Sequence, residues 1–220
     1  MFSSEMFLLV AQGFLESLYM TVISTTLAYV FGLPIGIILV ITDKEGIKPS
    51  PVVNRIIGGI VNILRSVPFI ILLVAVMPIT RAIVGTTIGS TATIVPLVIA
   101  SAPFIARLVE SSLKEVDKGV IEASLSMGAT TFQIVYKVMI PEAKPSLITG
   151  AAIATTTILS YSAMSGFVGG GGLGTIAINY GYYRSKTDIM LVMVAILVLI
   201  VQIFQEIGDF ISRKSDKRIK

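Results

Sequence analysis

Two short patterns in this sequence have spacings that other proteins use to bind nucleotides or to activate a serine. Residues 169–174 read Gly-Gly-Gly-Gly-Leu-Gly and contain the Gly-x-Gly-x-x-Gly spacing that holds a dinucleotide pyrophosphate. That spacing needs a strand before it and a helix after it, whereas here it follows a long apolar run. Ser111-x-x-Lys114 matches a penicillin-binding-protein motif without its companion motifs. We interpret the glycines as a flexible or tightly turned external loop and the serine–lysine pair as a chance match.

The side chains that perform most catalytic and metal-binding chemistry are missing. The chain has no Cys, which excludes disulfides and thiolate ligands, and no His, the commonest general base and metal ligand. It also lacks the Gly-x-x-x-x-Gly-Lys-Ser/Thr loop that holds ATP phosphates. We therefore predict that the chain is not an enzyme, has no catalytic residues and holds neither a metal nor a cofactor itself.

The composition indicates a membrane protein. Of 220 residues, 54% are hydrophobic and only 14% are charged, and the mean hydropathy is +0.90; soluble domains carry about 25% charged residues. The pI near 9.3 does not indicate nucleic-acid binding, because the basic residues lie in short stretches between apolar runs. The first residues lack the basic region of a cleavable signal peptide, so we expect the first apolar run to remain as a membrane anchor.

Five apolar stretches are long enough to cross a bilayer, which takes roughly 20 residues each. They cover residues 13–41, 56–80, 88–108, 146–168 and 189–211. The predicted fold is therefore an all-α, polytopic membrane protein with five transmembrane helices, forming one domain over residues 1–220. The first stretch is long enough to tilt or to bend at Gly32-Leu33-Pro34.

The Lys and Arg residues predict the orientation. One set of loops is rich in them: Lys44, Lys48, Arg55, Arg107, Lys114, Lys118, Lys137, Lys144, Arg213, Lys214, Lys217, Arg218 and Lys220. The opposite set has only Arg81, Arg184 and Lys186. The positive-inside rule places the first set in the cytoplasm, with the N-terminus outside, the C-terminus inside and the segment 109–145 cytoplasmic. Arg65 falls within an apolar run, and two explanations stay open: a shallow helix whose arginine extends to the headgroups, or a cytoplasmic gate.

The membrane segments lack an evident energy source. Glu16, Glu206 and Asp209 are expected near helix ends, and no acidic residue lies at 149–168 or 189–205 to carry protons. We infer that the chain moves a solute with energy from another subunit. An ion-driven secondary transporter, with sodium coordinated by hydroxyls and carbonyls, is the alternative.

The fourth stretch is rich in small and hydroxylated residues. Small residues permit close helix packing in lipid, and hydroxyls also suit a helix that lines a translocation path. Tyr161, Ser162 and Met164 are the candidates for contact with a solute.

The charged segment 109–145 predicts two short helices. Asp117 or Gly119 would cap a helix at 120–127, Gly128 suits its left-handed end, and Thr130 or Thr131 would start a second helix that ends before Pro141. The first helix either lies on anionic lipid or docks into a groove of a cytoplasmic partner.

The same segment resembles the EAA loop of bacterial ABC importer permeases. That loop reads Glu-Ala-Ala, three residues, Gly, nine residues, Ile-x-Leu-Pro. Here the matching residues are Glu122, Ala123, Ser124, Gly128 and Pro141, with Ser124 in place of the second alanine. In the family this loop forms a coupling helix that inserts into the ATPase subunit.

The resemblance extends over nearly the whole chain and is closest to methionine-uptake permeases. Further matching segments are 65–70, 102–107, 161–164, 171–174 and 180–182. The resemblance implies an inner-membrane, multi-pass permease that imports methionine, D-methionine or related amino acids by alternating access. It also implies a homodimer, two cytoplasmic ATPase subunits that carry ATP and Mg²⁺, and an extracytoplasmic binding lipoprotein. A permease for another amino acid or a methionine-containing peptide is the nearest alternative.

Overall fold

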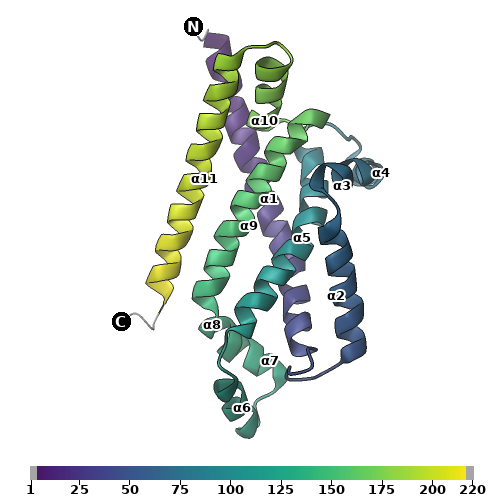
Figure 1. Cartoon of the computed structure of the whole chain (residues 1–220), viewed down its shortest axis with the longest axis vertical. Helices are drawn as coiled ribbons and strands as arrows, with labels where there is room; N and C mark the ends of the chain where they lie inside the picture. The colour runs from purple at the N-terminus through teal and green to yellow at the C-terminus, as the bar shows by residue number, and fades with distance from the viewer. Residues whose placement is uncertain (1–3, 217–220) are drawn as a thin grey trace. The chain divides into compact units, whose positions relative to one another are not determined.

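Every regular element in the described part of the chain is helical (Figure 1). The computed structural model describes residues 4–216. A helix satisfies its own backbone N–H and C=O groups, which is what a segment inside lipid requires. The predicted fold class, an all-α polytopic membrane protein, is confirmed. Lys217, Arg218 and Lys220, which contribute to the predicted cytoplasmic charge, lie outside the described residues.

Within residues 4–216, four long helices are apolar enough to cross a membrane. They are α1 (Ser4–Ile41), α5 (Ser90–Lys114), α9 (Lys144–Met164, within the helical run Lys144–Tyr182) and α11 (Thr187–Ser215). Each lies on one of the predicted stretches. Helix α1 runs through Pro34 without interruption, and it begins well before the predicted start. Our expectation that Glu16 lies near a helix end was therefore wrong, because three turns of α1 precede it.

The second predicted stretch, 56–80, is not one continuous helix. It contains α2 (Pro51–Ser66), α3 (Phe69–Ala75) and α4 (Met77–Val84). Pro68 disfavours a helical conformation at the residue before it. Pro78 lies in the first turn of α4, and Gly85, the C-cap of α4, is in the left-handed region (φ 84°). A fifth span exists only if α2 and α3 are counted as one broken pair. Arg65 is exposed in the last turn of α2, so it lies at a helix end and not in mid-helix.

The remaining elements are short. They are α6 (Lys118–Ser126), α7 (Thr131–Ile134), the π-helical turn η1 (Val135–Met139), α8 (Ile140–Glu142), the 3-10 turn η2 (Ser165–Val168), α10 (Gly172–Ile176) and the π-helical turn η3 (Ala177–Tyr182). Helices α5 and α9 take up both ends of the predicted segment 109–145. The segment between these two long helices is therefore shorter than predicted, because α5 and α9 continue beyond their apolar stretches.

The chain divides into two compact units. The first combines residues 4–27 with Val67–Ser101 and Thr155–Gln205. Its core contains Leu159 of α9, Leu173 and Ile176 of α10, and Met193 and Ile200 of α11. The apolar faces of these helices therefore pack on one another as well as on lipid.

The second unit combines Ala28–Ser66, Ala102–Ala154 and residues 206–216. Here the end of α1 packs closely on α5. A Cβ added to Gly32 would lie 2.8 Å from the carbonyl oxygen of Ala102, and one added to Gly36 would lie 2.6 Å from that of Ala106. Gly32 and Gly36 form a Gly-x-x-x-Gly face, the arrangement that lets helices approach closely in lipid.

Candidate functional site

Helix α6 carries the first part of the EAA-like pattern, and local sequence signals fix both of its ends. At its start, Asp117 is the N-cap, and its Oδ1 accepts a hydrogen bond from the Gly119 backbone N–H at 2.7 Å. This satisfies one of the free donors of the first turn. Of the two predicted caps, Asp117 is the one used, and the helix begins at Lys118 instead of Val120.

Gly128 ends α6 in the left-handed conformation, with φ at 78°. The Gly128 N–H donates to the Leu125 carbonyl at 2.9 Å, and the Ala129 N–H donates to the Ser124 carbonyl at 3.1 Å. These two bonds form a Schellman motif. The predicted left-handed turn at Gly128 is confirmed.

The next helix, α7, starts with a capping box. Thr130 Oγ1 accepts from the Gln133 N–H, and Gln133 Oε1 accepts from the Thr130 N–H at 2.8 Å. Helix α7 ends at Ile134, before Pro141 as expected, but helical turns continue beyond it through η1 into α8. The Ile140 N–H bonds to Val135, five residues back, and this wider turn leaves room before the proline ring.

The five predicted coupling residues lie in different surroundings. Glu122 and Ala123 are exposed on α6, whereas Ser124 is buried and its hydroxyl donates to the Val120 carbonyl at 2.8 Å. Pro141 is exposed in the first turn of α8. The structure thus gives Ser124 a packing role and leaves Glu122 and Ala123 accessible. Their role in coupling stays a prediction.

The α6–η1 segment exposes several large apolar side chains. Met127 is 81% exposed, Phe132 76% and Tyr136 63%. The Phe132 and Tyr136 rings stack, with centroids 6.0 Å apart and planes 4° from parallel. An exposed group of large apolar side chains such as this is typical of an interaction surface.

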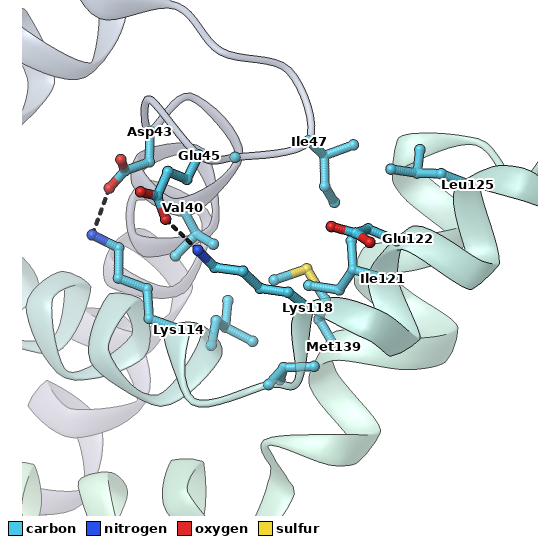
Figure 2. Close-up of a pocket in the computed structure, with 13 residues that line it drawn as sticks. Val40, Asp43, Glu45, Ile47, Lys114, Lys118, Ile121, Glu122, Leu125 and Met139 are labelled. Atoms are coloured by element: carbon cyan, nitrogen blue, oxygen red, sulfur yellow. Dashed lines mark hydrogen bonds and ion pairs between the residues drawn. The ribbon is translucent and has the colours of Figure 1, made fainter.

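A cavity of about 570 Å³ lies between α6, the end of α5 and the loop 42–50 that follows α1 (Figure 2). Its apolar wall comes from Val40, Ile47, Leu113, Val116, Ile121, Leu125 and Met139. Two ion pairs cross the region: Asp43 with Lys114 at 2.6 Å, and Glu45 with Lys118. Glu122 also lines the cavity, so one predicted coupling residue has a face turned toward the loop.

These ion pairs shift the ionisation of the loop. The hydrogen bond from Lys114 holds the pKa of Asp43 below its usual value, and the one from Lys118 does the same to the pKa of Glu45. Conversely, Glu45 raises the pKa of Lys118. All three groups are therefore charged at neutral pH, which is the state the pairs require.

Sequence reasoning missed an ionic cluster on α5. Glu110 is buried, and its two carboxylate oxygens accept from Arg107 Nη1 at 2.5 Å and from Lys114 at 2.9 Å. The spacing of these residues, three and four apart, places them on one helix face and was the available signal.

The candidate path residues of α9 point in different directions. Tyr161 stacks on Phe69 of α3, with ring centroids 4.5 Å apart. Ser162 is buried and donates to the Leu159 carbonyl of its own helix at 2.7 Å, whereas Met164 is exposed. The structure does not bring the three side chains together. Contact with a solute stays a prediction for Tyr161 and Met164, and the geometry gives Ser162 no free hydroxyl hydrogen.

The glycine-rich segment is a tightly packed turn, as expected, and no strand precedes it in residues 4–216. The Gly172 N–H donates to Glu16 Oε2 at 2.8 Å, and the Leu173 N–H donates to Ser17 Oγ at 2.9 Å. A Cβ on Gly172 would lie 2.6 Å from Ser17 Oγ. The glycines thus allow the backbone to reach α1, and Glu16 is engaged in holding that turn.

Among residues 4–216, no group of three or more acidic, Cys or His side chains is arranged to hold a metal ion. What the described residues around α6 do offer is an apolar surface, two ion pairs and a cavity.

Known proteins resemble this chain over most of its length. The family described as "Binding-protein-dependent transport system inner membrane component" matches residues 32–220. The chain is 51% identical over 203 residues to the probable D-methionine transport system permease protein MetI of Vibrio cholerae, covering 92% of this chain and 90% of that protein. It is 45% identical over 181 residues to the methionine import system permease protein MetP of Bacillus subtilis, covering 82% of each.

Solved structures give the same result. A chain of the MetNI methionine ABC transporter, in inward-facing conformations, matches with a TM-score of 0.97 and 47% identity, covering 98% of this chain and all of that one. A chain of an amino acid ABC transporter matches at 19% identity with a TM-score of 0.78, which shows a shared fold alone. The chain belongs to the family of inner-membrane components of binding-protein-dependent transport systems.

Proposed function

We propose that this chain is the membrane-spanning permease subunit of an ATP-driven importer of methionine. The observation that carries the substrate assignment is the 51% identity, over 92% of the chain, to a relative named for D-methionine transport. D-methionine and related amino acids fall in the same substrate class.

In this proposal α6 is the coupling helix. Its two capped ends hold it as a rigid body, and Met127, Phe132 and Tyr136 present apolar surface beside it. An amphipathic helix with such a surface suits a groove on a partner. The partner is a cytoplasmic ATPase that carries ATP and Mg²⁺, so the permease itself has no hydrolytic activity.

The complex we propose contains two copies of this chain, two ATPase subunits and an extracytoplasmic binding lipoprotein. The four or five membrane spans of one chain would form only one side of a path. Two copies of the chain, related by a two-fold axis, would enclose the path between them. The positive-inside rule supports an N-terminus outside and a cytoplasmic α6.

Transport then follows alternating access. ATP binding draws the two ATPase subunits together, the coupling helices move with them, and the path opens outward; hydrolysis resets it. This is rigid-body movement of packed helices, one of the ways in which proteins switch between two states. Tyr161 and Met164 are the residues of α9 that we place along the path.

The substrate is tested in a methionine auxotroph that lacks its own high-affinity uptake. Expression of this chain with its ATPase and binding lipoprotein should restore growth on low external methionine and uptake of labelled methionine. Unlabelled D-methionine should compete. Uptake of another amino acid with no effect of methionine would refute the substrate assignment.

The energy source is tested in proteoliposomes. The permease alone under a sodium or proton gradient should show no uptake, whereas the complete complex with internal ATP should. Gradient-driven flux through the isolated permease would support a secondary transporter instead.

The docking surface is tested by Phe132→Asp, which places a charge in the apolar patch. We expect loss of ATPase co-purification. Lys137→Asp is the matched control, since Lys137 is exposed on the same segment but is not apolar, and it should retain the ATPase. Equal retention by both variants would contradict docking through this patch.

A further inference from the structure

A series of polar contacts joins α2 to α5 in the second unit. Arg107 of α5 donates through Nη2 to the Gly58 carbonyl at 3.2 Å and to Asn62 Oδ1 at 2.8 Å, both on α2. Its Nη1 contacts Glu110 at 2.5 Å. The guanidinium therefore holds α2 and α5 in one register through its fixed fork of donors.

The same series of contacts continues from α5 to the loop 42–50. Glu110 accepts from Lys114 at 2.9 Å, and Lys114 also pairs with Asp43 at 2.6 Å. Because Glu110 is buried, losing either cation would leave a charge without full compensation. The loop is thus tied to α5 by the partly exposed Asp43–Lys114 pair, whose lysine also compensates the buried Glu110.

The loop itself is stiff. Its backbone folds back on the end of α1, with the Lys48 N–H donating to the Ile41 carbonyl and the Ser50 N–H to the Thr42 carbonyl, each at 3.0 Å. Asn54 of α2 donates to the Leu39 carbonyl at 2.8 Å. A loop bonded at both ends in this way transmits a displacement instead of absorbing it.

One ion pair carries the connection from this loop to α6. Glu45 pairs with Lys118, the first residue of the helix (Figure 2). Ser124 is the only residue of α6 that is buried, and the cavity lies beneath the Ile121 and Leu125 face. Because few apolar contacts hold α6 in place, an ion pair at its first turn has a large influence on the orientation of the helix.

We infer that Glu45 and Lys118 are positioning residues that set the orientation of α6 against the loop 42–50, and through it against α5 and α2. The inference rests on the proposed function, in which α6 receives the movement of the ATPase. With the pair intact, α6 and the helices move together. Without the Glu45–Lys118 pair, α6 tilts into the cavity, and part of the movement of the ATPase does not reach the membrane helices.

The expected effect is moderate. Glu45 and Lys118 are 74% and 70% exposed in their side chains, and such pairs contribute little to overall stability. We expect a roughly two- to fivefold decrease in substrate transported per ATP hydrolysed. This factor corresponds to the free energy that an exposed ion pair typically contributes.

The experiment uses the complete transporter in proteoliposomes. Glu45→Lys and Lys118→Glu are measured singly and together, with ATPase co-purification, ATP hydrolysis and uptake of labelled methionine recorded for each. Each single variant should keep its ATPase but transport less per ATP, and the double swap should restore the ratio. Lys48→Glu is the matched control, because it reverses a charge at another exposed position of the loop and should leave the ratio unchanged.

Hydrogen exchange at 118–126 provides a readout that does not depend on the substrate. Exchange should be two- to fivefold faster in the single variants and should return to the wild-type rate in the swap. Unchanged exchange in the single variants, or a swap that restores neither quantity, would overturn the inference. Absence of methionine uptake by the wild-type complex would overturn the proposed function and leave the exchange test to decide the inference.

Discussion

Replacement of Gly128 isolates the contribution of a single backbone conformation to the candidate coupling segment. Gly128 has φ at 78°, and an added Cβ would meet nothing within 4 Å. Gly128→Ala therefore introduces no clash with neighbours, and its cost is the left-handed conformation alone. That cost is about 1–2 kcal/mol for a residue with a Cβ, which corresponds to a roughly 5- to 30-fold smaller population of the native turn.

The turn is needed because its two hydrogen bonds close α6. If Gly128→Ala opens it, the amides that follow should lose protection, and the α6–α7 surface should lose its fixed shape. The assay is hydrogen exchange of residues 118–134 in the assembled complex, together with uptake. We expect exchange to rise by roughly the same factor of 5 to 30 and uptake to fall.

Two variants make this result interpretable. Gly128→Asn should retain most of the wild-type behaviour, because Asn tolerates the left-handed region better than Ala does. Gly59→Ala should be neutral or slightly stabilising, since Gly59 lies inside α2 with open space around it. The reasoning is refuted if Ala and Asn at position 128 behave alike, or if Ala leaves exchange unchanged.

Three further predictions test the packing, capping and ionisation of the second unit. Gly36→Ala would place a Cβ 2.6 Å from the Ala106 carbonyl oxygen and should lower stability by about 1–3 kcal/mol, measured as a lower midpoint of thermal unfolding in detergent. Thr130→Ala removes the capping box and should cost about 1 kcal/mol, seen as faster exchange in α7, while Thr130→Ser should retain protection. Lys114 lowers the pKa of Asp43, so the pair stabilises the loop above the usual carboxyl range and loses that effect as pH falls through the lowered pKa. Asp43→Asn should remove this acid-dependent loss of exchange protection at 42–50, an effect of about 1 kcal/mol or less because the pair is partly exposed.

The features that could be predicted from sequence are those that local chemistry determines. Asp117, Gly128 and Thr130 act on backbone groups within a few residues, so the ends of α6 and the start of α7 followed from residue type and spacing. The long apolar helices followed from length and hydropathy for the same reason.

The features that could not be predicted depend on residues far apart in the chain or on competition between local preferences. Glu110 is buried only because Arg107 and Lys114 share its face and because Asp43 reaches Lys114 from another segment. The break after α2 falls inside an apolar run, where hydropathy favours one span and Pro68 opposes it. Hydropathy averages over such a break and so does not detect it.

The close contact between Gly32 of α1 and Ala102 of α5 sets a requirement on the timing of synthesis. The two residues are 70 positions apart, and a ribosome adding about 5–20 residues per second needs roughly 4–14 s to make the interval. During those seconds α1 is already made while its partner helix does not yet exist. During that interval the Gly32–Gly36 face lacks its contact with α5. Correct assembly therefore requires that α5 is synthesised and inserted before the Gly32–Gly36 face of α1 packs stably on another helix.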